Sequence, residues 1–183
     1  EFIALAKAKP GQLNFSSAGI GSTTHFAAEL FKSMAAIDVV HITYKGATEA
    51  MTEIVTGRVQ FFISALPNTL PLVKEGRLLA LGVSSRSRLP AIPDIPTITE
   101  SGLPGYYWDG WYGLLAPAKT PRPVIAKLNK EITRVLTLPE MAQRWAALGA
   151  EAAPTAPEQF DKAIAAQMAL VTKLARAANI KAE

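Results

Sequence analysis

The stretch Leu13-Asn14-Phe15-Ser16-Ser17-Ala18-Gly19-Ile20-Gly21-Ser22-Thr23-Thr24 decides the fold of this 183-residue chain. Its first five residues alternate apolar and polar side chains, as a short strand does. A glycine loop follows, and an apolar helical stretch then runs to residue 35. A strand, a glycine loop and a helix in this order can aim several backbone N–H groups at one point, with the positive end of the helix behind it. The stretch therefore predicts a site for an anion such as a carboxylate or a phosphate.

The composition is that of a folded protein and excludes several classes of site. Hydrophobic residues make up 49% of the chain and charged residues only 19%, so we do not expect disorder. The net charge is +4, but Lys and Arg are scattered, which argues against nucleic acid as a partner. The chain has no cysteine, which excludes disulfides, thiolate metal sites and a cysteine nucleophile. An anionic ligand remains compatible with this charge.

The first residues indicate that a longer protein contains this chain. The sequence starts Glu1-Phe2-Ile3, without methionine and already in a helical pattern. We therefore expect a fragment whose beginning is missing, and a signal peptide, if one exists, would lie in the missing part.

The first half of the chain alternates predicted helices and strands. Helices are expected over 2–9, 22–35, 48–56, 67–75 and 97–101, and strands over 13–17, 39–42, 59–63 and 78–83. This order predicts a parallel α/β sheet with right-handed crossovers. Ligands bind such sheets at the carboxyl ends of the strands. The loops at 17–22 and 64–68 both fall at such ends, so we expect two ligand cradles, the second including Ala65 and the amide of Asn68.

The second half is predicted to cross an exposed loop and end in three helices. An aromatic, extended segment over 106–116 follows the loop at 84–96. The first closing helix starts at Thr120-Pro121 and should bury an apolar stripe that includes Val124, Leu128 and Val135. The second spans 139–148. A capping box at Thr155–Glu158 should begin the third.

Several blocks of sequence resemble the Bug family, the solute-binding receptors of tripartite tricarboxylate transporters. The first runs from Asn14 to Gly19 and from Gly21 to His25. The others are Tyr44-Lys45-Gly46, Leu103-Pro104-Gly105-Tyr106, Trp111-Tyr112-Gly113-Leu114-Leu115-Ala116-Pro117 and Leu148-Gly149-Ala150-Glu151. Each block alone is weak, but their order and spacing together are specific and cover nearly the whole chain.

The resemblance implies an α/β fold of the periplasmic-binding-protein type (type II, two-lobed) that closes on a small carboxylate. Residues 1–105 would form one complete lobe, with a parallel or mixed sheet and a ligand loop. Residues 106–183 would cross the hinge and return to a first lobe that is only partly present. The family further implies a periplasmic location, membrane transporter subunits as partners, no enzymatic activity, no cofactor and no metal. The incomplete lobe leads us to expect that this piece packs against another copy or forms only part of the working molecule.

The ligand-binding residues that we predict are listed here: Ser17, Ala18, Gly19, Gly21, Ser22, Thr23, Thr24, Ala65 and Asn68. Family members often carry an acidic residue at the position of Ser64, so recognition of an amino group is left open. His25 could face the ligand, and Trp108 and Trp111 could form a wall of the cleft, but a structural role is the default expectation for all three. The sequence does not identify the carboxylate.

Two other classes of function stay open on the sequence alone. An anion- or nucleotide-binding α/β enzyme could use Gly19-Ile20-Gly21, but Thr24 stands where a dinucleotide fingerprint needs its third glycine. The chain also lacks a recognisable Ser–His–acid set. A small-anion sensor without transport would look the same in these residues.

Overall fold

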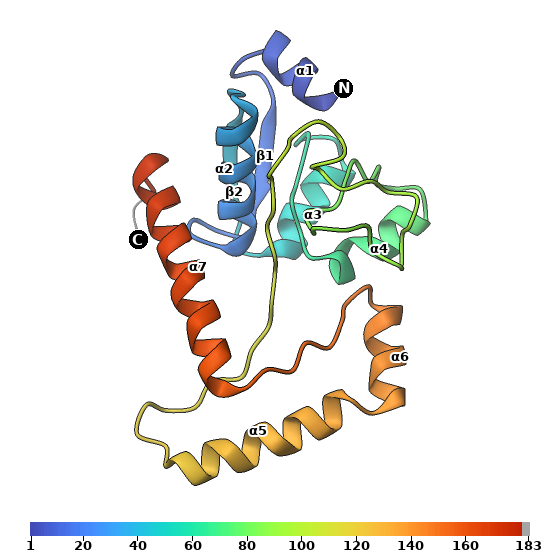
Figure 1. The fold of residues 1–183 in the computed structure, drawn as a ribbon. Helices are drawn as coiled ribbons and strands as arrows, with labels where there is room; N and C mark the ends of the chain where they lie inside the picture. Colours follow the sequence, from blue (N-terminus) through green and yellow to red (C-terminus); the bar gives the residue numbers. More distant parts are fainter. Residues whose placement is uncertain (181–183) are drawn as a thin grey trace.

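The structure of the protein is a computed structural model that describes residues 1–180 (Figure 1). The first part carries α1 (Phe2–Ala8), β1 (Asn14–Ser17), α2 (Thr23–Ala35), β2 (Val40–Thr43), α3 (Ala47–Val55) and α4 (Leu66–Lys74). A long segment without regular structure follows, and α5 (Arg122–Leu136), α6 (Pro139–Ala147) and α7 (Pro157–Ala177) close the chain. Most helices lie within two residues of their predicted bounds.

The sheet is small and parallel, with β1 in its middle. β1 and β2 pair from Asn14 opposite Val40 to Ser17 opposite Thr43. On the other edge of β1, Phe15 forms a single parallel bridge with Phe61. The carboxyl end of β1 therefore delivers the chain directly into the glycine loop, as the sequence predicts.

Two predicted strands are wrong in the described structure. The strand expected over 59–63 is reduced to the bridge at Phe61, and of residues 78–83 only Val83 pairs, with Thr97. Leu79 is 84% exposed and Leu81 is 52% exposed, so most of this apolar run is not a buried strand. The helix expected over 97–101 is also absent, and a turn stands there with the Glu100 carboxylate accepting from the Thr97 N–H (2.7 Å).

The core lies where the sheet meets α2 and the start of the extended segment over 106–116, the crossing segment. Phe15 is fully buried and packs on the ring of Phe61, with centroids 5.4 Å apart. Tyr106 anchors the crossing segment, because its buried hydroxyl donates to the carbonyl of Ala27 in α2 (2.9 Å). Leu174 of α7 joins the same cluster, so the last helix packs against α2 rather than against its sequence neighbours.

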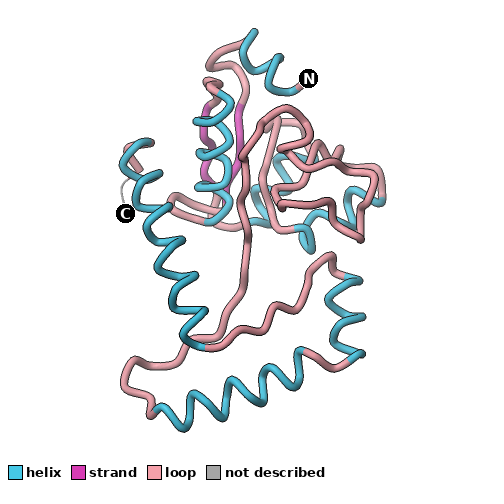
Figure 2. The backbone as a smooth tube through the Cα atoms, viewed as in Figure 1, coloured by secondary structure: helices cyan, strands magenta, loops and turns pink. Residues whose placement is uncertain are grey.

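Helices α5 and α6 lie away from this core. Figure 1 and the tube in Figure 2 show the chain leaving the core in an extended course, with α5 and α6 reached before α7 returns to α2. No side chain of α5 or α6 is buried among the described residues. The burial predicted for the stripe at Val124, Leu128 and Val135 is therefore wrong in the described structure, since these side chains are 45%, 48% and 40% exposed.

The start of α7 also differs by one residue from the prediction. Ala156, not Thr155, precedes the helix, and Pro157 occupies the first turn. The Gln159 side chain, not that of Glu158, accepts from the backbone N–H of Ala156 (3.4 Å). No helix within residues 1–180 combines the length and apolar character needed to cross a membrane.

The buried ring of Phe15 gives a first prediction. Phe15→Ala should lower the free energy of unfolding by about 3–5 kcal/mol, because it removes a fully buried aromatic ring at the centre of the sheet. Tyr112→Ala is the control: its side chain is 87% exposed, and the change should stay within about 0.5 kcal/mol. Urea unfolding measures both, and equal losses would contradict the assigned core.

Candidate functional site

The glycine loop is fixed at its end by a helix cap. Ser22 precedes α2, and its Oγ accepts from the N–H of His25 (3.2 Å) while its carbonyl accepts from Phe26 (3.0 Å). This is the capping role for which serine is favoured. Gly19 and Gly21 have φ angles of +133° and +75°, which side-chain-bearing residues rarely adopt. The two glycines therefore let the chain turn from β1 into the cap.

Many of the predicted ligand donors are already used inside the loop. Four backbone N–H groups donate to loop or helix atoms: Ala18 to Thr24 Oγ1 (2.9 Å), Gly19 to Ser17 Oγ (3.2 Å), Gly21 to His25 Nδ1 (3.1 Å) and Ser22 to the Gly19 carbonyl (3.2 Å). Ser22 Oγ also lies 2.9 Å from Thr24 Oγ1. These groups hold the loop in shape and are not free for a ligand in this conformation.

Three other N–H groups remain free. Within the described residues, the backbone N–H groups of Ile20, Thr23 and Thr24 and the Thr23 hydroxyl have no hydrogen-bond partner. The Thr23 and Thr24 N–H groups belong to the first turn of α2, where no intrahelical acceptor exists. They lie at the positive end of a 13-residue helix, which favours an anion there.

Two histidines lie beneath the loop and support it. The rings of His25 and His41 stack with centroids 4.0 Å apart. His41 Nε2 lies 2.6 Å from Ser17 Oγ, and His25 Nδ1 accepts from Gly21. His25 is 4% exposed, so its ring is structural and does not face the ligand loop's open side.

Both histidines are held neutral. Burial is the main cause that lowers the pKa of His41 to about 4, and the neighbouring His25 and Lys32 add to it. Burial also lowers the pKa of His25, although Glu29 opposes the shift from 4.0 Å away. A neutral His25 keeps an unprotonated Nδ1, which the Gly21 N–H requires as its acceptor.

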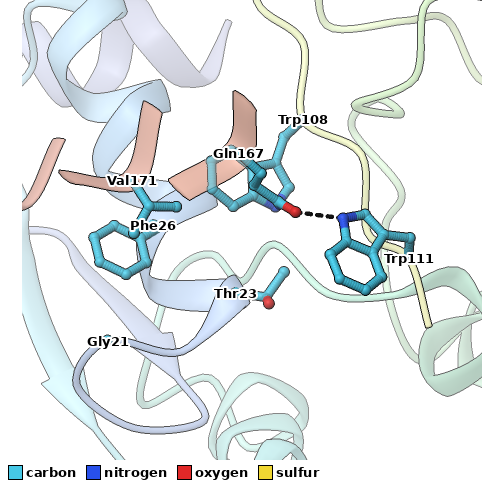
Figure 3. A pocket seen from close by; sticks show the side chains of 7 residues that line it. All are labelled: Gly21, Thr23, Phe26, Trp108, Trp111, Gln167 and Val171. Carbon is cyan, nitrogen blue, oxygen red and sulfur yellow. Dashed lines mark hydrogen bonds between the residues drawn. The ribbon is translucent and has the colours of Figure 1, made fainter. Parts of the chain in front are cut away.

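A cavity of about 220 Å³ opens beside the free end of α2 (Figure 3). Three distant parts of the chain line it: the loop and α2, the crossing segment, and α7. The lining residues are Gly21, Thr23, Phe26, Trp108, Trp111, Gln167 and Val171. The indole N–H of Trp111 donates to Gln167 Oε1, which ties the crossing segment to α7. None of the lining side chains carries a charge.

The predicted site residues separate into three groups. Gly21 and Thr23 line the cavity, whereas Ser17, Ala18, Gly19, Ser22 and Thr24 form the loop behind it. Ala65 and Asn68 do not line this cavity. Ala65 precedes α4, its carbonyl accepts from the Asn68 N–H (3.0 Å), and the Asn68 side chain is exposed.

Sequence reasoning assigned no site role to Phe26, Gln167 or Val171, and left Trp108 and Trp111 open. Gln167 had a signal, because it falls between Ile164 and Val171 on the apolar face of α7, where a polar side chain is unexpected. Within residues 1–180, no group of three His, Cys, Asp or Glu side chains could hold a metal ion. The arrangement offers hydrogen-bond donors and apolar walls, which suits binding.

Comparison with known proteins gives consistent findings. The sequence matches the family described as "Tripartite tricarboxylate transporter family receptor" over residues 1–180. It is 32% identical to protein BugT of Bordetella pertussis over 157 residues, which is 86% of this chain and 48% of BugT. The chain thus spans about half the length of this relative.

Solved structures share this fold. A Rhodopseudomonas palustris protein solved with adipate shares 31% identity at a TM-score of 0.90, over 98% of this chain and 60% of that one. MatC from the same organism, solved with bound malate, shares 32% identity at a TM-score of 0.78, over 94% of this chain and 57% of MatC.

The neutral histidines predict a pH-dependent stability. Because the pKa of His41 is lower in the folded protein than its ordinary value of 6.5, the unfolded chain takes up the proton first as the pH falls. The free energy of unfolding should therefore fall between pH 6.5 and about 4. Urea unfolding at pH 7 and pH 5 tests this, and His41→Gln should lose less stability over that interval than the wild type. Parallel losses in both proteins would contradict the role assigned to His41.

Proposed function

This chain belongs to the tripartite tricarboxylate transporter family receptors, and from this premise we propose that its protein captures a small carboxylate in the periplasm and delivers it to a tripartite membrane transporter. The match confirms the resemblance to the Bug family and the α/β periplasmic-binding-protein fold. Family and structural neighbours are binding receptors, so the enzyme alternative is set aside.

The observation that carries the proposal is the set of free donors at the end of α2. The N–H groups of Ile20, Thr23 and Thr24 and the Thr23 hydroxyl lie at the positive end of the helix, and Thr23 faces the cavity in Figure 3. A carboxylate is the common chemistry of the adipate and malate bound to two structural neighbours. We infer that a carboxylate of the ligand accepts from these groups.

The energetics favour a second surface that closes over the ligand. A charge-assisted hydrogen bond contributes about 1.5–3 kcal/mol, and a helix terminus adds about 0.3–1 kcal/mol. A micromolar complex needs roughly 8 kcal/mol net of the cost of association. One loop is therefore marginal, and we propose that a second lobe supplies further donors when it closes.

We propose that the chain is divided between two lobes. Residues 1–105 form one lobe with the ligand loop, and residues 106–183 cross the hinge toward the other lobe. The end of α7 returns from there to the core of residues 1–105, where Leu174 packs. The uncovered apolar faces of α5 and α6 are consistent with a missing part of that lobe, or with self-association of this piece. Ala65 and Asn68 stay a proposed second contact. Asn68 is exposed and does not line the cavity, so its amide would contact a ligand from outside the cavity.

The conformation of Gly19 offers a direct test. Gly19→Val should weaken carboxylate binding by about 100-fold or more, because a β-branched residue cannot hold φ at +133° and the loop that presents the donors would rearrange. Titration calorimetry of the complete gene product with adipate and malate measures the effect.

Gly102→Val is the matched control. Gly102 also has a positive φ, +103°, with no heavy atom within 4 Å of an added Cβ, and it lies outside the loop and the cavity lining. Both variants should lose comparable stability, of order 1–3 kcal/mol. Only the loop variant should lose affinity, and unchanged binding in Gly19→Val would remove the site from this loop.

A further inference from the structure

The net positive charge of this chain comes from one segment. The chain carries 19 Lys and Arg against 15 Asp and Glu, and between 119 and 136 there are five basic residues but only one acid, Glu131. The remainder of the chain is balanced, with 14 basic and 14 acidic residues. The whole excess of positive charge therefore lies on α5 and just before it. We call the five basic residues the basic patch: Lys119, Arg122, Lys127, Lys130 and Arg134.

Three residues of the basic patch form an exposed stripe along α5. Lys127, Lys130 and Arg134 are three and four positions apart, so they lie on one side of the helix, and all three are exposed. The Asn129 side chain donates to the Thr155 carbonyl (2.8 Å) and so marks the side of α5 that faces the chain. At about 100° per residue, Lys127 and Arg134 lie roughly 140–160° around the helix from Asn129. These two side chains therefore leave α5 on the side away from Thr155.

Acidic neighbours neutralise little of the basic patch. Its three lysines form no ion pair among the described residues. Arg122 pairs with Glu158 (3.5 Å) and Arg134 with Glu131 (2.9 Å), but the two arginine side chains are 92% and 64% exposed. Water screens such surface pairs, so they hold the arginines only weakly. All five residues are therefore available to an acidic partner.

The apolar stripe of α5 lies on a different side of the helix from the basic stripe. Leu128 is about 100° from Lys127 and roughly 160° from Lys130 around the helix. An element that covered the apolar stripe would therefore leave the basic stripe accessible. Figure 1 shows α5 at the opposite end of the molecule from α1, so the basic patch lies far from the N-terminal helix. No residue of the patch lines the cavity.

The charge of the patch indicates the chemistry of its partner. Membrane proteins carry an excess of Lys and Arg in their cytoplasmic loops, so their other face is poor in basic residues. Asp and Glu on that face are less neutralised, and a basic surface complements them. A lipid surface fits less well. Helices that lie on membranes carry Trp or Phe among their apolar residues, whereas α5 has no aromatic residue.

We propose that the basic patch of α5 is the surface through which the receptor docks on an acidic periplasmic face of its membrane transporter. The inference rests on the proposed receptor function and adds to it the place and the chemistry of the contact. Charges at such a contact act mainly on the association rate and on its salt dependence. Ligand binding and docking then use separate residues, since the patch lies outside the cavity lining.

The chain offers a matched control for reversing two charges of the patch. Lys127→Glu/Lys130→Glu is the patch variant, and Lys7→Glu/Lys9→Glu is the control. Both change the net charge by the same amount, and all four lysines are exposed. The control residues lie in and directly after α1, at the other end of the molecule (Figure 1). A difference between the two variants therefore reports on the place of the charges and not on their sum.

Surface plasmon resonance measures the docking of the complete gene product on the membrane subunits of the transporter, held in nanodiscs of uncharged phosphatidylcholine. The patch variant should bind about tenfold more weakly or worse, because like charges then face each other, and the control should stay within about twofold. Added salt should slow association of the wild type more than that of the patch variant. Calorimetry with adipate and malate should give one ligand affinity for all three proteins.

The outcomes separate this inference from the proposed function. Docking that is unchanged in the patch variant, or weakened equally in both variants, overturns the docking surface while the receptor function stands. If the wild type binds neither acid but docks through the patch, the surface stands without the proposed ligand. If the wild type does not bind the membrane subunits, the proposed delivery and the surface both fall.

Two further results bear on the partner and on folding. Wild-type binding to phosphatidylglycerol vesicles that hold no transporter, lost in the patch variant, would make a lipid surface the occupant and overturn the proposal. Should the patch variant fail to fold, Lys127→Gln/Lys130→Gln decides, because it removes both charges without adding acids beside Glu131. It should weaken docking by a smaller factor, and unchanged docking would again overturn the surface.

Discussion

The conformation of the glycine loop depends on two neutral histidines. His25 accepts from the N–H of Gly21 and His41 pairs with Ser17, while the two rings stack on each other beneath the turn. Either contact changes when a ring gains a proton, since His25 would lose its acceptor nitrogen and the stacked rings would repel. Burial against Phe15 keeps the rings neutral and so keeps the loop in the shape that leaves the right donors free.

That shape divides the loop's N–H groups into two sets with different tasks. Those of Ala18, Gly19, Gly21 and Ser22 stabilise the turn, and those of Ile20, Thr23 and Thr24 stay available. A loop that presented all its donors to the ligand would need the ligand to hold its shape. Here the donors are preorganised, so binding need not order the backbone. Because the lining is uncharged, the proposed anion would be bound by backbone dipoles and a helix end and not by an ion pair.

The local part of this arrangement could be predicted from the sequence, and the tertiary part could not. β1, the loop and α2 follow from alternation, glycines and a serine cap, all within a dozen residues. The strand over 78–83 was wrong because its apolar run resembles a buried strand, yet no described element covers Leu79. The stripe of α5 was correct as a pattern, but a pattern does not say whether its partner is present. Phe26 and Gln167 are 141 positions apart by their numbers, and only the packing of α7 on α2 brings them to one cavity.

The aromatic crossing segment connects the core to α7 through contacts at both of its ends. At one end Tyr106 is fixed in the core through its hydrogen bond to Ala27. At the other, Gly113 lies so close to the ring of Phe160 in α7 that a Cβ could not fit there, and Trp111 packs edge-on against the same ring at 5.0 Å. Trp108 lies between the two anchors, on the cavity wall. A displacement of α7 relative to α2 would therefore change the cavity, because both helices line it together with this segment.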